Sequence, residues 1–248
     1  MRQMTNSIHN PLLYKGYRII SRYEPEQARE LLDKIQAGKG GFSEVLRDNK
    51  NSFIAIIRFR EDDLVVKVPR SRNRRIYERL LTLFRNGEAF RRYDSMLKLI
   101  QLGLNGAKPV LAAEKRRLGM VTHNVFVYEY IDGVIPGRGH EKLLFDELLK
   151  LHSMGYTRRD SKPGNFLISD GKVHFIDFRL TKPILLKNLR ICMELNSFFR
   201  AMPSARQHFE GSDEMGICFR VAGVLESISD RMNNYRKAIS SRLKGNTQ

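Results

Sequence analysis

The chain has 248 residues, of which 44 are Lys or Arg and 27 are Asp or Glu, so its formal net charge is +17. A hydrophobic content of 42% excludes a disordered basic tail, and only two cysteines exclude a disulfide scaffold. The excess of cations predicts an anionic partner, which can be nucleic acid, a membrane surface or a phosphorylated small molecule.

The first twenty residues lack the apolar stretch of about 7–15 residues that defines a secretory signal. The longest purely apolar run, Phe53–Ile57, is far too short to span a membrane. We therefore expect a cytoplasmic protein with no transmembrane segment, held at an anionic membrane surface, if at all, by its charge.

The first half of the chain alternates mainly between strands and helices. A helix is predicted over 24–37 because Ala28, Leu31, Leu32 and Ile35 recur at helical spacing. A second, longer helix is predicted over 76–102. Short strands are predicted at 15–21, 43–47, 53–59, 64–68, 110–116 and 124–131.

The second half is mainly helical. A glycine-containing hinge at 132–139 precedes an amphipathic helix over 141–154. Two short strands, 166–169 and 173–176, flank an Asp-Gly turn, and 180–248 is expected to be helical. The pattern predicts an α+β protein with two lobes that meet at a cleft: a β-rich N-lobe over 1–132 and a helical C-lobe over 133–248.

The polar residues Asp160, Lys162 and Asn165 follow the helix at 141–154, and Asp177 ends an apolar stretch further on. Phosphoryl transfer needs a carboxylate that deprotonates a hydroxyl, a metal ion on the phosphates and cations near the transferred group. Asp160 is the candidate base, and Lys162 is the candidate cation at the γ-phosphate. Asn165 and Asp177 are candidate oxygen ligands of Mg²⁺. Each residue alone is more typical of a turn, loop or strand end.

An apolar strand upstream contains one lysine, Lys67, within the stretch Leu64–Val68. Side chains alternate between the faces of a strand, so this lysine points into a face that is otherwise buried. A buried lysine is costly unless it is paired. Glu88, in the next predicted helix, can form that pair, and ATP phosphates offer the lysine a function. The two residues are therefore candidates for binding the nucleotide.

Taken in their order along the chain, the motif around Lys67, the helix glutamate Glu88 and the polar residues from Asp160 to Asp177 resemble the motifs of the protein-kinase-like superfamily. The resemblance covers about residues 40–180. The resemblance implies a two-lobed fold with a small antiparallel-sheet N-lobe and a short helical C-lobe. It also implies that Lys67 and Glu88 form the ATP-binding ion pair, and that Glu129 and Ile131 lie at the adenine hinge.

More narrowly, the chain is similar to the bacterial lipopolysaccharide core heptose kinase family. The similarity lies in the Tyr14–Arg18 opening, the Glu129–Gly133 hinge, Leu151-His152 and the short catalytic loop. It implies an enzyme on the cytoplasmic face of the inner membrane that transfers phosphate from ATP, with Mg²⁺, to a heptose hydroxyl, expected on the second heptose. The implied partners are the core glycolipid and the anionic membrane surface, and no nucleic acid is expected.

The chain departs from common protein kinases at two positions. Arg158 stands where a histidine is usual, and Arg179 stands where the metal motif usually has glycine. Together with a short C-terminal part, this favours a kinase of small molecules or glycolipids. One alternative is a small-molecule kinase of the aminoglycoside-phosphotransferase type. Another is a basic pseudokinase or nucleic-acid-binding scaffold.

Two segments are candidates for covering the ATP phosphates with backbone N–H groups. Gly38–Val45 reads like a glycine-rich nucleotide loop, although Gly38 also suits a helix stop. Asp48–Ser52 is the turn expected from the heptose-kinase resemblance. The sequence leaves both open.

Aromatic residues and methionine gather in the basic C-terminal part, at Phe198, Phe199, Met202 and Phe209. They can form a membrane-interfacial surface, but packing in a core is the favoured interpretation.

Overall fold

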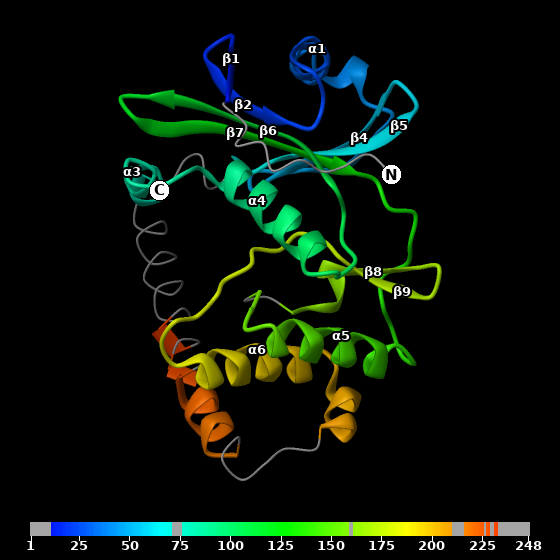
Figure 1. The fold of residues 1–248 in the computed structure, drawn as a ribbon, viewed down its shortest axis with the longest axis vertical. Helices are drawn as coiled ribbons and strands as arrows, with labels where there is room; N and C mark the ends of the chain where they lie inside the picture. Colours follow the sequence, from blue (N-terminus) through cyan, green and yellow to red (C-terminus); the bar gives the residue numbers. More distant parts are fainter. Residues whose placement is uncertain are drawn as a thin grey trace, which may run out of the picture. The chain divides into compact units, whose positions relative to one another are not determined.

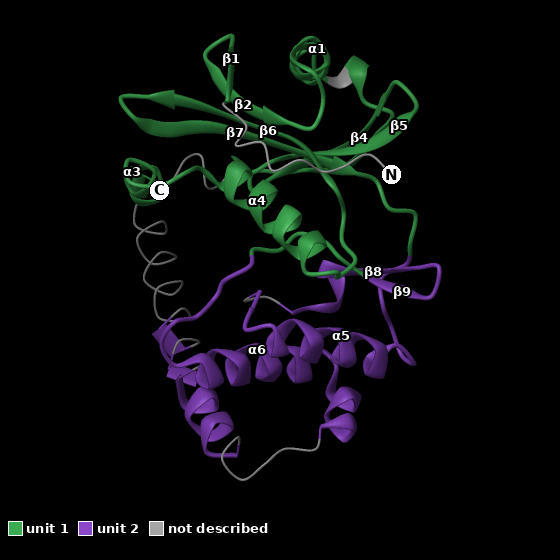
Figure 2. Cartoon of the chain, in the orientation of Figure 1, with its two compact units in different colours: residues 1–133, 174–179 green, residues 134–173, 180–248 purple. Residues whose placement is uncertain are grey.

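The computed structural model describes residues 11–70, 76–158, 161–209, 216–225, 227–228 and 231–232. Contacts divide the chain into two compact units, coloured separately in Figure 2. Unit 1 comprises residues 1–133 and 174–179, and unit 2 comprises residues 134–173 and 180–248. Residues 174–179, which the sequence assigned to the second lobe, therefore belong with the first unit.

Unit 1 is built on a seven-stranded antiparallel sheet in the order β1-β2-β6-β7-β5-β4-β3. Together with the helices, it confirms the predicted α+β class. The strands are β1 (Leu12–Tyr14), β2 (Tyr17–Ser21), β3 (Glu44–Asp48), β4 (Phe53–Phe59), β5 (Asp62–Val68), β6 (Pro109–Arg117) and β7 (Met120–Glu129).

Helix α1 (Pro25–Gln36) covers one face of this sheet, and α4 (Glu88–Gln101) lies against the other (Figure 1). A proline at the start of α1 suits the first helical turn, where no N–H is needed. The apolar positions predicted from its periodicity are all buried, at Ala28, Leu31, Leu32 and Ile35. They pack on sheet residues that include Ile57, Leu64, Val66 and Val127.

The single helix predicted over 76–102 is wrong, because the chain forms α3 (Ile76–Leu81) and α4 with a break between them. At the break, short-range i→i−3 hydrogen bonds end α3, and the chain also bonds to the sheet. The Thr82 hydroxyl accepts the N–H of Val121 at 2.8 Å, and the Gly87 N–H donates to the Glu114 carboxylate at 2.7 Å. These partners are far away in the sequence, so helical periodicity did not reveal the break.

Unit 2 contains the helices α5 (Glu141–Ser153) and α6 (Lys187–Ala201), with 3₁₀ turns η2 (Pro163–Asn165) and η3 (Pro203–His208). Strands β8 (Phe166–Ser169) and β9 (Lys172–Phe175) form a hairpin, and the boundary between the units falls within β9. Its turn residues, Asp170 and Gly171, both have positive φ, as a two-residue hairpin turn requires.

The core of unit 2 is aromatic. Phe145 of α5 stacks on Phe198 of α6 at 6.4 Å between ring centroids and contacts Phe199 and Phe209 at 5.8 and 6.2 Å. Phe198, Phe199 and Met202 are all buried. Core packing, the favoured interpretation of this aromatic group, is confirmed. In the part of the chain that the structure describes, no helix is long and apolar enough to cross a membrane.

Candidate active site

Lys67 lies on β5 with its side chain on the sheet face opposite to α1. Leu64 and Val66, which alternate with it along the strand, belong to the core beneath α1. Lys67 is only 8% exposed, and its ammonium forms an ion pair with Asp177. The burial expected from the strand pattern is thus observed, and one partner of the lysine is the candidate metal ligand.

Asp177 follows β9 in a left-handed backbone conformation with φ of 50°. Such a conformation is uncommon for a residue other than glycine, and it occurs preferentially at functional sites. Its carboxylate is held by two cations, because Arg92 also forms an ion pair with it. The side chain remains 33% exposed, so it stays accessible to solvent.

Glu88, the predicted partner of Lys67, is buried at the first position of α4. Its carboxylate accepts from Arg92 at 2.8 Å, one helical turn later, and from Arg179 at 3.4 Å. Arg92 therefore links Glu88 to Asp177, and through it to Lys67. Arg92 was not among the predicted site residues, although its i,i+4 spacing from Glu88 was a usable signal.

The start of α4 is anchored by a carboxylate that sequence reasoning also missed. Glu114 is fully buried on β6 and accepts the N–H of Gly87. It also bonds Arg116 and Arg18, with N–O distances of 2.8 and 3.2 Å. A carboxylate at a helix N-terminus is favourable because it meets unpaired N–H groups and the positive end of the helix dipole. Glu114 thereby positions Glu88.

The two predicted hinge residues lie at the end of β7. Glu129 pairs with Leu64 of β5, and its carboxylate forms ion pairs with Arg22 and Lys108. The backbone N–H of Glu129 donates to the Lys108 carbonyl at 2.9 Å. The side chain of Glu129 therefore ties the residues just after β2 and just before β6 to the end of β7, and Ile131 follows two residues later.

The β3–β4 turn, Asp48–Ser52, lies at the end of β5 that carries Lys67, because Ile54 of β4 pairs with Lys67. The Asn49 side chain accepts the Ser52 N–H at 3.0 Å. Arg70 clamps the turn through Asp48 at 2.6 Å and the Asn49 carbonyl at 3.0 Å. This candidate phosphate cover is thus an ordered turn beside the lysine.

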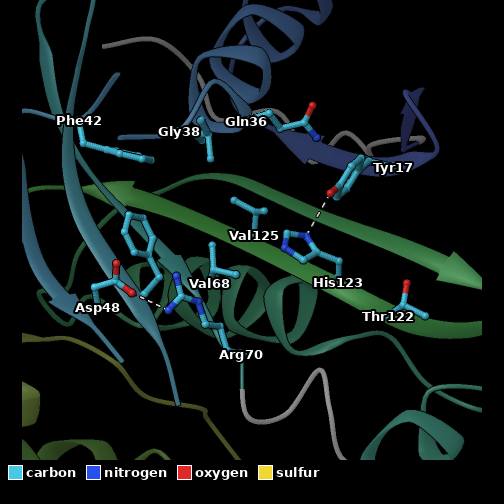
Figure 3. Close-up of a pocket in the computed structure, with 12 residues that line it drawn as sticks. Tyr17, Gln36, Gly38, Phe42, Asp48, Val68, Arg70, Thr122, His123 and Val125 are labelled. Atoms are coloured by element: carbon cyan, nitrogen blue, oxygen red, sulfur yellow. Dashed lines mark hydrogen bonds and ion pairs between the residues drawn. The ribbon is translucent and has the colours of Figure 1, made fainter. Parts of the chain in front are cut away.

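The other candidate, Gly38–Val45, begins on the opposite face of the sheet. Gly38 lines a cavity of about 650 Å³ together with Phe42, Val68 and Val125 (Figure 3). Val68 is the neighbour of Lys67 in β5, and neighbouring side chains of a strand point to opposite faces. Gly38 therefore lies on the other side of the sheet from the Lys67 side chain, and the same cavity is also lined by Asp48 and Arg70 of the other candidate turn.

The residues of the predicted catalytic loop lie in unit 2, and Asp160 itself lies outside the described residues. Lys162 is exposed just before η2, and Asn165 ends this turn, donating its N–H to the Lys162 carbonyl at 2.9 Å. Arg158, which replaces the usual histidine, is 2% exposed, and its guanidinium lies 4.1 Å from the centroid of the Phe166 ring. The arginine is thus buried against the Phe166 ring.

A buried glutamate of α6 holds both flanks of Asp160. Glu194 accepts the Arg158 N–H at 2.9 Å, the Ser161 hydroxyl at 2.6 Å and a bond from His152 at 3.3 Å. Burial alone would raise the pKa of Glu194, but the hydrogen bonds of His152 and Ser161 and the charge of Arg158 outweigh it and lower this pKa. Glu194 is therefore a charged anchor for the loop, and local sequence did not indicate it.

The structure thus gathers the candidate residues into two groups. Lys67, Glu88 and Asp177 share one network of ion pairs in unit 1. Lys162 and Asn165 share the η2 turn in unit 2. Among the described residues, no cluster of three His, Cys, Asp or Glu side chains is arranged to hold a metal ion by itself.

Comparison with known proteins identifies the family. Residues 8–199 match the family described as "Lipopolysaccharide core biosynthesis protein (WaaY)". None of the curated proteins matches the sequence. The solved structure of WaaP in complex with acyl carrier protein is similar, with a TM-score of 0.52 and 15% identity over 83% of this chain and 88% of that chain. The kinase domain of PknI from Mycobacterium tuberculosis gives a TM-score of 0.40 and 12% identity over 78% and 76%.

The likeness to WaaP confirms the protein-kinase-like fold expected from the order of the motifs. The family match confirms the resemblance to lipopolysaccharide core kinases. The chain belongs to the WaaY family of lipopolysaccharide core biosynthesis proteins and is a kinase that phosphorylates a sugar hydroxyl of that core.

Proposed function

We propose that this enzyme transfers the γ-phosphate of Mg-ATP to a hydroxyl of the second heptose of the lipopolysaccharide inner core. The observation that carries the proposal is the ion pair between buried Lys67 and Asp177, in a chain whose family acts in core biosynthesis. A lysine beside an aspartate at the end of an apolar strand is the arrangement that phosphate and metal binding need.

The nucleotide is bound by unit 1 in this proposal. Lys67 binds the ATP phosphates, while Glu88 and Arg92 hold the charged network in place. The Asp48–Ser52 turn covers the phosphates, since it lies at the Lys67 end of β5 and Arg70 fixes it there. Backbone groups at Glu129 and Ile131 contact the adenine.

Asp177 and Asn165 are the proposed ligands of Mg²⁺. A carboxylate and an amide oxygen are hard donors of the kind this ion prefers, and Mg²⁺ commonly binds one or two protein oxygens and completes its shell with phosphate and water. Asp177 fits this role because its carboxylate lies beside the phosphate-binding Lys67 and its side chain remains 33% exposed. When bound, the ion neutralises charge on the phosphates.

Asp160 is the proposed general base that accepts the proton of the attacking heptose hydroxyl. Its position depends on Glu194, which holds Arg158 and Ser161 on either side of it. Lys162 is proposed to stabilise negative charge on the transferred phosphoryl group, because it is a cation two residues from the base.

The test is transfer of labelled phosphate from Mg-ATP to purified core lipopolysaccharide that lacks phosphate. We expect Asp160→Asn to lower kcat by at least about 100-fold, since removal of a general base typically costs 10²–10⁴. Asp170→Asn is the matched control, because Asp170 is an exposed turn residue of the same unit. Equal rates for Asp160→Asn and wild type would overturn the mechanism.

The acceptor is tested separately with lipopolysaccharide truncated after the first or after the second heptose. We expect transfer only to the longer acceptor, with the phosphate located on the second heptose by mass spectrometry. Transfer to the shorter acceptor would overturn the assignment of the sugar but not of the chemistry. Transfer to an aminoglycoside but to neither glycolipid would favour the small-molecule kinase.

A further inference from the structure

Three consecutive large aliphatic residues project from unit 2 between β9 and α6. Ile184, Leu185 and Leu186 are 95%, 80% and 70% exposed. A run of exposed apolar residues like this is unfavourable in water and is normally found only where it has a function. None of the candidate catalytic residues lies in this run.

The surface around the run carries positive charge. Lys187 follows it directly, Lys182 precedes it by one proline, and Arg190 is exposed one turn into α6. Over residues 179–209 the sequence has six Lys or Arg and a single acidic residue, Glu194. Because Glu194 is only 2% exposed, the ionised groups that this segment presents to solvent are cations.

The run borders a cavity of about 460 Å³, which Ile184 and Leu185 line. Arg190 and Arg200 also line it, together with the buried carboxylate of Glu194, so the charges inside the cavity are mixed. The cations that can meet phosphate headgroups are therefore the solvent-exposed ones, Lys182, Lys187 and Arg190.

The run is held by a fixed framework on both sides. Before it, Thr181 and Thr157 exchange two backbone hydrogen bonds of 2.8 and 2.9 Å. After it, Leu186 adopts φ of 54° as the residue that precedes α6. A left-handed conformation is rare for leucine, so the backbone at the end of the run adopts a specific turn before α6.

We propose that Lys182–Lys187 inserts into the interface of an anionic phospholipid bilayer. Ile184, Leu185 and Leu186 enter the acyl boundary, while the flanking lysines and Arg190 meet the phosphate headgroups. A second copy of the chain is a poorer occupant, because two such cationic surfaces repel each other. The inference rests on the proposed function, to which it adds a means of reaching a glycolipid acceptor. Vesicle binding itself needs neither ATP nor acceptor, so it is tested independently of phosphate transfer.

The sequence contains no tryptophan, so one introduced residue reports on its own surroundings. In Leu185→Trp, we expect the fluorescence to shift to shorter wavelength on addition of phosphatidylglycerol–phosphatidylcholine vesicles, and to be quenched by brominated lipid. Leu13→Trp is the matched control, because Leu13 is 73% exposed in unit 1. Its emission should not change with vesicles.

Vesicle binding is measured in parallel by co-sedimentation. We expect Ile184→Ser/Leu185→Ser to bind at least about tenfold more weakly, because two aliphatic side chains no longer leave water. Lys182→Gln/Lys187→Gln should weaken binding to anionic vesicles and reduce its salt dependence. Leu13→Ser should bind like wild type.

Three results would overturn the proposal. The first is an unchanged Leu185→Trp spectrum with anionic vesicles, and the second is an equal shift in Leu13→Trp. The third is a shift that grows with protein concentration in the absence of vesicles, which would show self-association instead. Phosphate transfer is measured on the same protein preparations. If a protein binds vesicles but transfers no phosphate, the result counts against the proposed function and not against membrane insertion.

Discussion

Each of the two units buries one glutamate that holds the backbone beside candidate catalytic residues. In unit 1, Glu114 accepts the Gly87 N–H immediately before Glu88. In unit 2, Glu194 accepts groups of Arg158 and Ser161, on either side of Asp160. A buried carboxylate provides strong acceptors for backbone N–H groups that have no partner in a helix or strand.

The two anchors differ in the groups that balance their charge. Glu114 is paired with the guanidinium groups of two arginines. Glu194 instead accepts hydrogen bonds from the His152 ring and the Ser161 hydroxyl. The anchor of the proposed nucleotide-binding unit is therefore held mainly by ion pairs, and the anchor of the proposed catalytic loop mainly by hydrogen bonds.

The largest effect is expected from Glu194→Ala. Removing this acceptor leaves buried donors without a partner, which should lower the free energy of unfolding by about 3–5 kcal/mol. Because the catalytic loop is displaced, kcat should fall by about 100-fold while KM for ATP changes little. Urea unfolding and transfer kinetics measure the two effects, with exposed Asp146→Ala as control. A variant with normal kcat would show that the loop does not depend on Glu194.

A smaller effect is expected from Glu114→Ala, about 2–3 kcal/mol in the free energy of unfolding. Its arginine partners are 36% and 22% exposed, so water partly replaces the lost carboxylate. The kinetic result should differ from that of Glu194→Ala, because the displaced residue is Glu88: KM for ATP should rise more than kcat falls. If both variants changed the same kinetic constant, the prediction that Glu114 affects ATP binding and Glu194 affects catalysis would be wrong.

Gly87→Ala tests the same anchor with one added methyl group. A Cβ at this position would lie 2.4 Å from Oε2 of Glu114 and 2.7 Å from Oδ1 of Asn124. Relief of this overlap should cost about 1–2 kcal/mol of unfolding free energy and raise KM for ATP. Gly137→Ala is the control, because an added Cβ meets no atom within 4 Å there. Equal stabilities of the two variants in urea would contradict the close packing.

The smallest effect concerns pH. The pKa of Glu194 is lowered from its ordinary value of 4.5, since the bonds from His152 and Ser161 outweigh the effect of burial. A carboxyl group with a lowered pKa in the folded state contributes stability above its unfolded pKa and loses it as pH falls through the folded value. Unfolding free energy should therefore decrease below about pH 4.5, and less steeply in Glu194→Gln. If the unfolding free energy decreased with falling pH as steeply in Glu194→Gln as in the wild type, the lowered pKa of Glu194 would be contradicted.

Much of the fold could be predicted from local patterns. Helix α1 was located by its apolar spacing, the β8–β9 turn by Asp170-Gly171, and buried Lys67 by alternation along β5. These predictions succeeded because each depends on neighbours within a few residues. The break between α3 and α4 was missed, since its cause is hydrogen bonding to strands more than twenty residues away.

The sequence by itself determined which candidate residues are present: the strand lysine, the helix glutamate, and the order of Asp160, Lys162, Asn165 and Asp177 along the chain. Only the tertiary structure decided their immediate partners. It joined Lys67 to Asp177, placed Arg92 between Asp177 and Glu88, and selected Glu194 to hold the catalytic loop. The physical reason is that these contacts depend on distance in space: Arg92 and Glu88 are one helical turn apart, but no periodic pattern relates Lys67 or Arg92 to Asp177, or Arg158 to Glu194.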